Sequence, residues 1–326
     1  MLANERTTRR RLPRAEAIAA GASMRSSTSS AAAAPTTTQA SPGRRKQVIH
    51  VADVVRARKE LDAIWKATPA NAPSIDQNGD ASWGSVVLCE ATTWNDFERW
   101  LKSNEGRVRR WVFEPLADRP PGKGRVVIYS IPSSILEETA GFVNSSIVMQ
   151  IQEAGNDIRL FSTVRWKASP TCRTRDFGQE PDASLTPVGL TIGGSVLAAG
   201  PDFPYPNVIV EVAYKNDSLE RLRAKLDRWM SDTTSVQVAI GIKIDAASPS
   251  RVAILLQRGQ PVMPPVEFGH PDPGPLQISF PLASVYAGVA LPPALAGLGN
   301  TPISIDLIQL RTVMDEAIGQ ELPAAQ

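Results

Sequence analysis

The chain has 326 residues, of which 42% are hydrophobic and 21% charged, so it can build one large domain or two ordinary ones around packed cores. It has no apolar run near the ~18–20 residues of a membrane span. Its two cysteines and two histidines are too few for a disulfide framework or a His/Cys zinc site. We therefore expect an intracellular protein without membrane spans, whose chemistry would use carboxylates, lysines and a hard metal ion.

The formal net charge of +2 is unevenly distributed along the chain. Residues 1–46 contain nine Lys or Arg and two Glu, a net charge of +7, which leaves −5 for the remainder. Because this segment is rich in Ser, Thr, Ala and Pro, we expect a disordered basic tail. Its arginine clusters are typical of a nuclear address, a nucleic-acid contact or a transit peptide, and no apolar block for a secretory signal follows them. The acidic remainder argues against a nucleic-acid-binding surface over the whole fold.

Residues 47–123 are predicted to form a small α+β N-terminal extension. The stretch "ADVVRARKELDAIWKA" is amphipathic at helical spacing, and "WGSVVLCEA" is typical of a strand. "TWNDFERWLKS" predicts a second helix with Thr93 as its N-cap. "ADRPPGKGR" is rich in turn residues and ends the extension.

Residues 124–260 are predicted to form the α/β core. A strand, a crossover helix and another strand make the unit that pairs in parallel, so the order predicts a central mixed β-sheet flanked by helices. The predicted elements are a strand at 124–131, a helix at 132–155, a strand at 157–166, a long loop, a strand at 207–214, a helix at 217–232, and strands at 235–245 and 251–259. Residues 261–326 are predicted as a further strand, a Pro-rich connector over 282–300 and a C-terminal helix over 304–320.

Three features of the core are candidates for one site. Asp182 follows Pro181 just before a strand, and Glu211 interrupts "PNVIVEVAYKN" 29 residues later. The third is a lysine, either Lys215 on the same strand parity as Glu211 or Lys225 on the following helix. At about 100° per residue, Lys225 lies at the rim of that helix's apolar stripe, from which it can reach over the sheet.

These residue types suit metal-dependent phosphodiester hydrolysis. Mg²⁺ takes hard oxygen ligands and keeps several waters, so one or two carboxylates with a substrate phosphate are enough. The metal activates a water and stabilises charge on the phosphate, and a nearby lysine assists both. Parity places Glu211 on the strand face away from Val210, Val212 and Tyr214, which we expect to be the packed face.

The segments "PDASLTP", "PYPNVIVEVAYKN", "LRAKLDRWM" and "SVQVAIGIKI" together resemble the PD-(D/E)XK nuclease superfamily, in its Uma-like restriction-endonuclease branch, which also occurs in Crinkler-associated eukaryotic proteins. The resemblance covers roughly residues 124–260 and implies a restriction-endonuclease-like fold. It implies that Asp182 and Glu211 bind Mg²⁺ or Mn²⁺, that Lys225 is catalytic, and that the substrate is DNA or RNA. Lys215 is the weaker alternative for the lysine.

Two departures keep a second hypothesis open. The superfamily's usual lysine lies two residues after the glutamate, where this chain has Ala213. An additional acid on the preceding helix would be Glu137 or Glu138, but the spacing of Glu137 from Ser134 also fits a capping box. The alternative is therefore a binding or effector module that keeps the fold and has lost the chemistry. The oligomeric state and the compartment, the nucleus included, stay open.

Overall fold

The computed structural model describes twelve segments of the chain, which are residues 49–66, 86–104, 107–108, 110–116, 122–128, 134–168, 170–173, 178–200, 202–214, 217–245, 249–269 and 276–321. The predicted basic tail and Lys215 lie outside them. Residues 46–326 belong to a single unit, to which every segment described below belongs.

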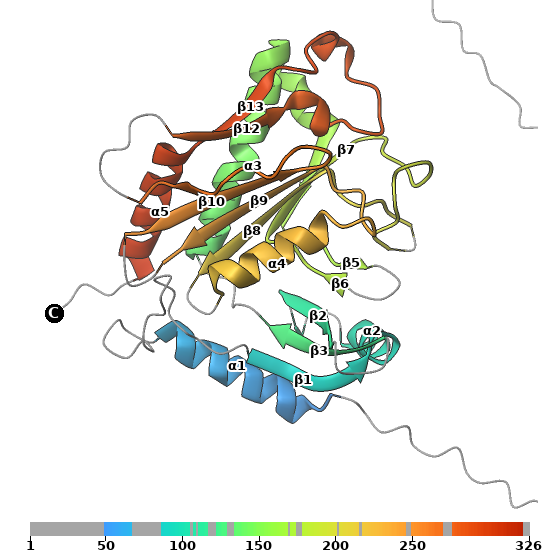
Figure 1. Ribbon diagram of the computed structural model, residues 1–326, viewed down its shortest axis with the longest axis vertical. Helices are drawn as coiled ribbons and strands as arrows, with labels where there is room; N and C mark the ends of the chain where they lie inside the picture. The colour runs from blue at the N-terminus through green and yellow to red at the C-terminus, as the bar shows by residue number, and fades with distance from the viewer. Residues whose placement is uncertain are drawn as a thin grey trace, which may run out of the picture. The chain divides into compact units, whose positions relative to one another are not determined.

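A six-stranded mixed sheet forms the centre of the fold (Figure 1). Its parallel pair is β8 and β9, and the other neighbours are antiparallel. The strand order is β11 (Val266–Glu267), β10 (Arg251–Gln257), β9 (Val238–Ile244), β8 (Val208–Tyr214), β7 (Ala183–Pro187) and β4 (Val164–Lys167). The predicted α/β class with a central mixed sheet and flanking helices is confirmed, and it is compatible with a restriction-endonuclease-like core.

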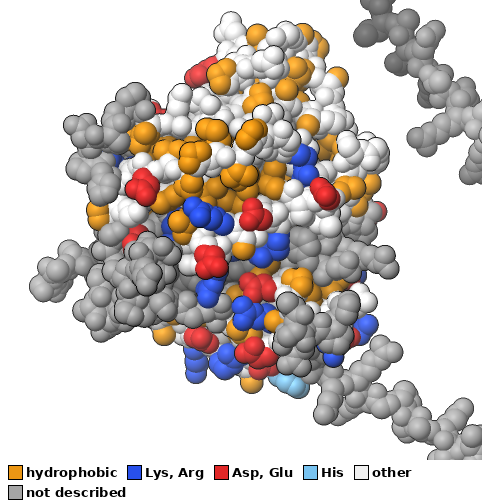
Figure 2. Space-filling view, viewed as in Figure 1, with side chains coloured by type: hydrophobic (Ala, Val, Ile, Leu, Met, Phe, Trp, Pro, Cys, Tyr) orange, Lys and Arg blue, Asp and Glu red, His pale blue; other side chains and the backbone are white. Residues whose placement is uncertain are grey.

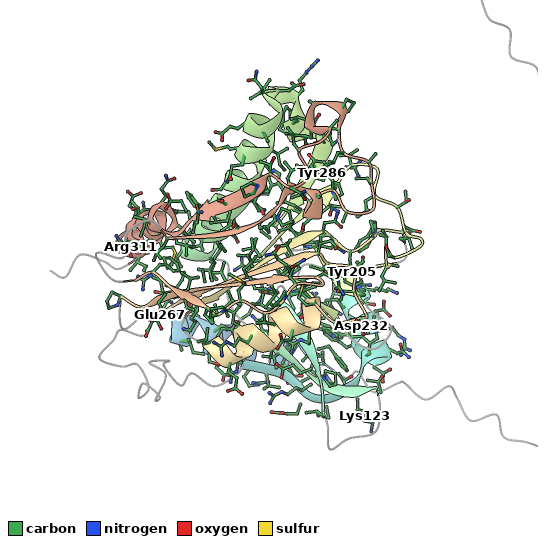
Figure 3. All side chains as sticks on the ribbon, turned by 45° about the horizontal axis from the view of Figure 1, so that its top comes forward. Lys123, Tyr205, Asp232, Glu267, Tyr286 and Arg311 are labelled. Carbon is green, nitrogen blue, oxygen red and sulfur yellow. The ribbon has the colours of Figure 1, made fainter. Side chains whose placement is uncertain are left out.

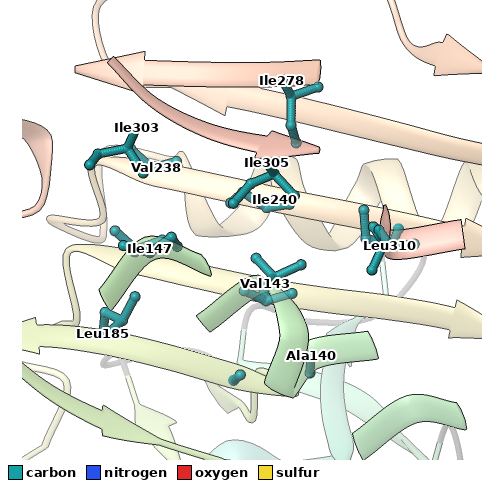
Figure 4. Packing of buried hydrophobic residues seen from close by; sticks show 14 of the residues in the cluster. Ala140, Val143, Ile147, Leu185, Val238, Ile240, Ile278, Ile303, Ile305 and Leu310 are labelled. Carbon is teal, nitrogen blue, oxygen red and sulfur yellow. The ribbon is translucent and has the colours of Figure 1, made fainter. Parts of the chain in front are cut away.

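Helix α3 (Ser134–Gly155) covers one face of this sheet. Its apolar residues recur at helical spacing and lie in the same cluster as the alternate residues of β8 and β9 (Figure 4). The small antiparallel sheet of β12 (Gln277–Pro281) and β13 (Pro302–Asp306) joins this core, as does helix α5 (Leu307–Glu321). Residues after 276 are therefore part of the main core, and not only a connector and a terminal helix.

Helix α4 (Leu219–Trp229) covers the opposite face of the central sheet. Its apolar stripe packs on the residues of β8 and β9 that point away from α3, so both faces of β8 are buried. The expectation that the Glu211 face is less packed than the other was wrong, because α4 closes over it. Gly241 permits the close approach, since a Cβ there would lie 2.6 Å from Leu226 Cδ1 and 3.3 Å from Leu222 Cδ1.

Gly241→Ala should therefore push α4 away from the sheet. We expect the free energy of unfolding to fall by about 1–3 kcal/mol, the usual cost of overpacking, measured by chemical denaturation. Gly319→Ala is the matched control, because a Cβ at this position of α5 meets nothing within 4 Å. That change should stabilise the protein by up to about 1 kcal/mol through helix propensity. Equal effects of the two substitutions would contradict the close packing of α4.

A second, five-stranded sheet has the order β1 (Val86–Thr93), β3 (Lys123–Ile128), β2 (Trp111–Pro115), β6 (Gly178–Gln179) and β5 (Cys172–Arg173). Helices α1 (Val51–Lys66) and α2 (Trp94–Ser103) pack against it around an aromatic cluster. The Thr93 cap is confirmed, since its hydroxyl accepts the Asp96 N–H at 3.1 Å. The predicted division at residue 124 cuts through this sheet, because β3 pairs with β1 and β2.

Several predicted elements differ from the structure. Residues 157–166 were predicted as one strand, but Ile158–Thr163 form a 3-10 helix and only Val164–Lys167 form β4. Asp157 starts this turn by accepting the Arg159 N–H at 2.9 Å. The long loop before residue 187 contains β5, β6 and β7, and the connector contains two single 3-10 turns, Leu282–Ser284 and Pro293–Leu295. Of the helices in the described segments, none has the length and apolar character to cross a membrane.

Candidate functional site

The central sheet brings the two predicted carboxylates next to each other. Strands β7 and β8 are antiparallel, and Ala183 lies opposite Val210, so continuing the register places Asp182 opposite Glu211. Directly opposed residues point to the same face, with Cβ atoms about 4.5–5.5 Å apart. Asp182 is also fixed by its own hydrogen bond, because Oδ2 accepts the backbone N–H of Val212 at 2.6 Å. Both carboxylates are buried, with 7% of Asp182 and 2% of Glu211 exposed.

Helix α4 places Lys225 and Trp229 over Glu211. The two residues are four apart, so they share one face of the helix. Trp229 Nε1 donates to Glu211 Oε1 at 2.6 Å, and Lys225 Nζ lies 3.9 Å from Glu211 Oε2. Lys225 is 2% exposed and also forms an ion pair with Oδ2 of Asp217. Tyr205, labelled in Figure 3, packs edge-on against Trp229, with the two ring centroids 6.4 Å apart.

The segment before β2 contributes a buried arginine that sequence reasoning did not identify. Arg110 Nη1 lies 3.3 Å from Asp182 Oδ1, and Nη2 lies 2.5 Å from Glu137 Oε1. The backbone N–H of Arg110 donates to Glu180 Oε2 at 2.8 Å. Arg110 has φ +55°, an uncommon conformation for a residue with a Cβ, and these contacts hold it there.

These side chains surround a cavity of about 10 Å³, the room that one water molecule takes. Among its described lining residues are four acidic and two basic side chains, an excess of two acidic groups in a buried place. In addition, Asp217 Oδ1 is buried and accepts no hydrogen bond. The ionisable lining residues are Arg110, Glu180, Asp182, Glu211, Asp217 and Lys225.

Burial changes the protonation of Glu211. Desolvation raises the pKa of this carboxyl from 4.5 to about 8; the Lys225 ammonium opposes the rise and the Asp182 carboxylate adds to it. The metal-free protein therefore holds a proton on Glu211 to a higher pH than an exposed glutamate does. Binding of a cation at this carboxylate would release that proton.

The raised pKa makes the stability of the metal-free protein depend on pH. Because the folded pKa of about 8 lies above the reference value of 4.5, Glu211 favours folding fully below pH 4.5, and this contribution is lost as pH rises to 8. Relative to Glu211→Gln, the free energy of unfolding of the wild type should fall by about 2–3 kcal/mol between pH 6 and pH 8, at 1.36 kcal/mol per pH unit. Denaturation of both proteins in EDTA measures this difference. A difference that does not change with pH would contradict the raised pKa.

The donor set fits a hard divalent cation. The donors that Asp182 and Glu211 offer are carboxylate oxygens, the preferred ligands of Mg²⁺ and Mn²⁺. Within the described segments no three His, Cys, Asp or Glu side chains form a group with metal-ligand geometry. What these residues offer is thus a two-carboxylate site, which Mg²⁺ accepts when water and substrate complete its coordination.

The structure gathers three of the predicted residues, Asp182, Glu211 and Lys225, around one cavity. Glu137 lies at the start of α3 with 49% of its side chain exposed, and its contact is with Arg110. The catalytic and metal-binding roles of Asp182, Glu211 and Lys225 stay predictions. Asp217 was missed, although it directly precedes Ser218, which caps α4 by accepting the Arg221 N–H. In the sequence, Asp217 was interpreted only as the first residue of the helix predicted over 217–232.

Comparisons with known proteins add little to this geometry. No family model and no curated protein matches the chain. Among solved structures, a chain from Anabaena variabilis ATCC 29413, described as a candidate nuclease belonging to DUF820, is similar with a TM-score of 0.38 and 15% sequence identity. The match covers 68% of this chain and 99% of the other. At this level of similarity, the case for a function rests on the cavity itself.

Proposed function

We propose that this protein is a metal-dependent nuclease that hydrolyses phosphodiester bonds of DNA or RNA. The observation that carries the proposal is the buried cavity, whose described lining has four acidic and two basic side chains. A divalent cation would compensate the excess negative charge that this lining carries when its acids are ionised. Asp182 and Glu211 also match the order of the two carboxylates in the PD-(D/E)XK pattern to which the sequence is similar, in its Uma-like branch, while Ala213 stands at the position of the usual lysine.

In this proposal Asp182 and Glu211 hold Mg²⁺ or Mn²⁺. When bound, the metal would supply an activated water and would neutralise charge on the phosphate. Lys225 orients that water by hydrogen bonding, and its ammonium is kept in place by Asp217. Arg110 holds Asp182 in position through their contact at 3.3 Å, and Trp229 does the same for Glu211 by donating to Oε1.

The rival function is a binding module that has kept the fold without the chemistry. Ala213 replaces the usual lysine, and Lys225 is already engaged by Asp217. In Figure 2 basic and acidic side chains are interspersed over α4 and the five-stranded sheet, so the described residues on that face form no continuous basic surface for a nucleic acid. Nucleic acid would then be contacted mainly at the site and its immediate surroundings.

Cleavage assays separate the two functions. The purified full chain is incubated with plasmid DNA, single-stranded DNA and an RNA transcript, each with Mg²⁺, Mn²⁺ or EDTA. We expect cleavage with a metal and none in EDTA. Calorimetric titration with Mn²⁺ is run in parallel. Metal binding without cleavage of any substrate would favour the binding module, and the absence of both would remove the metal site altogether.

A further inference from the structure

A second cavity lies between α3, the 3-10 helix at Ile158–Thr163 and strand β4. Its volume is about 290 Å³, near the lower end of the range of about 300–1,000 Å³ for small-molecule sites. Two aromatic side chains line it and remain largely exposed, with 58% of Phe161 and 63% of Trp166 accessible. Val148 and Met149 also line the cavity, and none of the lining residues that the structure describes is charged. The cavity therefore suits a neutral, flat group of modest size.

One polar side chain in this lining has no partner. Asn144 is 3% exposed, and neither its Oδ1 nor its Nδ2 makes a hydrogen bond. A buried carboxamide with both groups unpaired costs stability, and such groups in native proteins usually have a functional reason or an external partner. Once the Asn144 side chain turns toward the cavity that it lines, a ligand with an adjacent donor and acceptor would satisfy both of its amide atoms at once.

We infer that this cavity receives one unpaired nucleobase, stacked on Trp166 and Phe161, with its edge hydrogen-bonded to Asn144. The choice of ligand rests on the proposed function, while the cavity and the unpaired amide do not. An apolar side chain of a peptide would fit the same cavity but would leave the amide of Asn144 without a hydrogen bond. Through its major-groove edge adenine matches this requirement, since its N7 accepts and its N6 donates, the pairing that Asn makes with adenine. Guanine presents two acceptors on that edge.

The position of this second cavity suits a nucleic-acid strand that also reaches the candidate catalytic cavity. Leu136 lines the candidate catalytic cavity and Asn144 lies eight residues later on the same helix, about 12 Å along its axis. Strand β4 is an edge of the central sheet, and its Lys167 pairs with Ser184, two residues from Asp182. Arg165 and Lys167, the neighbours of Trp166, are exposed, so the same strand offers two cations to a phosphate backbone.

Calorimetry in EDTA tests the inference without involving the metal site. Adenosine monophosphate should bind the full chain roughly 5- to 150-fold more tightly than ribose 5-phosphate, the range expected for one stacked base. Trp166→Ala should abolish this difference. Asn144→Leu should lower the affinity for adenosine monophosphate and bring it level with that for guanosine monophosphate, while keeping or raising thermal stability, because the unpaired amide is gone. Val262→Ala, an 80% exposed residue that does not line the cavity, is the control.

The outcomes separate this inference from the proposed function. Glu211→Gln should bind adenosine monophosphate like the wild type, and such binding in a protein that cleaves nothing would support the base site while refuting the nuclease. The inference is overturned if adenosine monophosphate binds no better than ribose 5-phosphate, or if Trp166→Ala and Asn144→Leu change nothing. It is also overturned if an apolar peptide occupies the cavity and adenosine monophosphate does not displace it.

Discussion

Lys225→Met is expected to lower the free energy of unfolding of the metal-free protein by about 3–5 kcal/mol, the cost of removing one partner from a buried ion pair. Lys225 is 2% exposed and pairs with Asp217, which is also 2% exposed. Without the ammonium, the Asp217 carboxylate would lose its ion pair while its Oδ1 already lacks a hydrogen bond. The carboxylate of Glu211 would also lose the positive charge 3.9 Å away.

Chemical denaturation in EDTA measures this effect. Lys102→Met is the matched control, since its ammonium lies on the surface, 60% exposed, and 3.5 Å from Glu98. Surface pairs contribute about 0–1 kcal/mol, so this control should be nearly neutral. The double change Lys225→Met with Asp217→Asn should recover part of the loss, because it removes the stranded charge. If Lys225→Met costs no more than Lys102→Met, the buried ion pair is not a structural element of the site.

Glu211→Gln is expected to lower Mn²⁺ affinity and metal-dependent cleavage by more than about 100-fold. Residues that only support a metal ligand already cost about 10–100-fold when changed, and Glu211 is proposed to be a ligand itself. The substitution keeps the shape of the side chain and its acceptor for Trp229 Nε1 while it removes the charge. The fold should persist, and at pH 8 the metal-free variant should be the more stable protein.

Two other glutamates serve as controls for this change. Glu114 pairs with Arg125 at 2.8 Å on β2 and does not line the cavity, so Glu114→Gln should leave cleavage unchanged. Glu137→Gln tests the additional acid, which is half-exposed and contacts Arg110. We expect a loss of at most about 10–100-fold from Glu137→Gln if it only positions Arg110. A larger loss, like that expected for Glu211→Gln, would instead make Glu137 a metal ligand, and full activity of Glu211→Gln would refute the proposed site.

The sequence predicts well those elements whose apolar pattern is long and regular. Helix α3 and strands β8 and β9 were predicted within a few residues, because their apolar residues recur at helical spacing or in continuous runs. Strands β5 and β6 have two residues each, too few for any periodicity to appear. Strand β13 was merged with the C-terminal helix, because its role depends on pairing with β12, some 25 residues earlier in the chain.

The candidate site shows the same limit. Asp182, Glu211 and Lys225 could be proposed from spacing and strand parity, since they lie within one strand–strand–helix unit. Arg110 could not be proposed in this way, because it lies 72 positions before Asp182 and next to a strand of the other sheet. The full burial of Glu211 was also not predicted, since it depends on how closely α4 approaches the sheet at Gly241. Local pattern identifies residue types and faces, whereas long-range packing decides which charges share a buried space.

Crystals of the full chain soaked in Mn²⁺ at pH 8.5 test the central claim most directly, because the anomalous signal locates the ion. The account predicts one strong peak in the cavity, within about 2.2 Å of a carboxylate oxygen of both Asp182 and Glu211, and no such peak in Glu211→Gln crystals. Saturating Mn²⁺ without a peak between these two carboxylates, or with one held elsewhere, would contradict the metal site and with it the proposed nuclease.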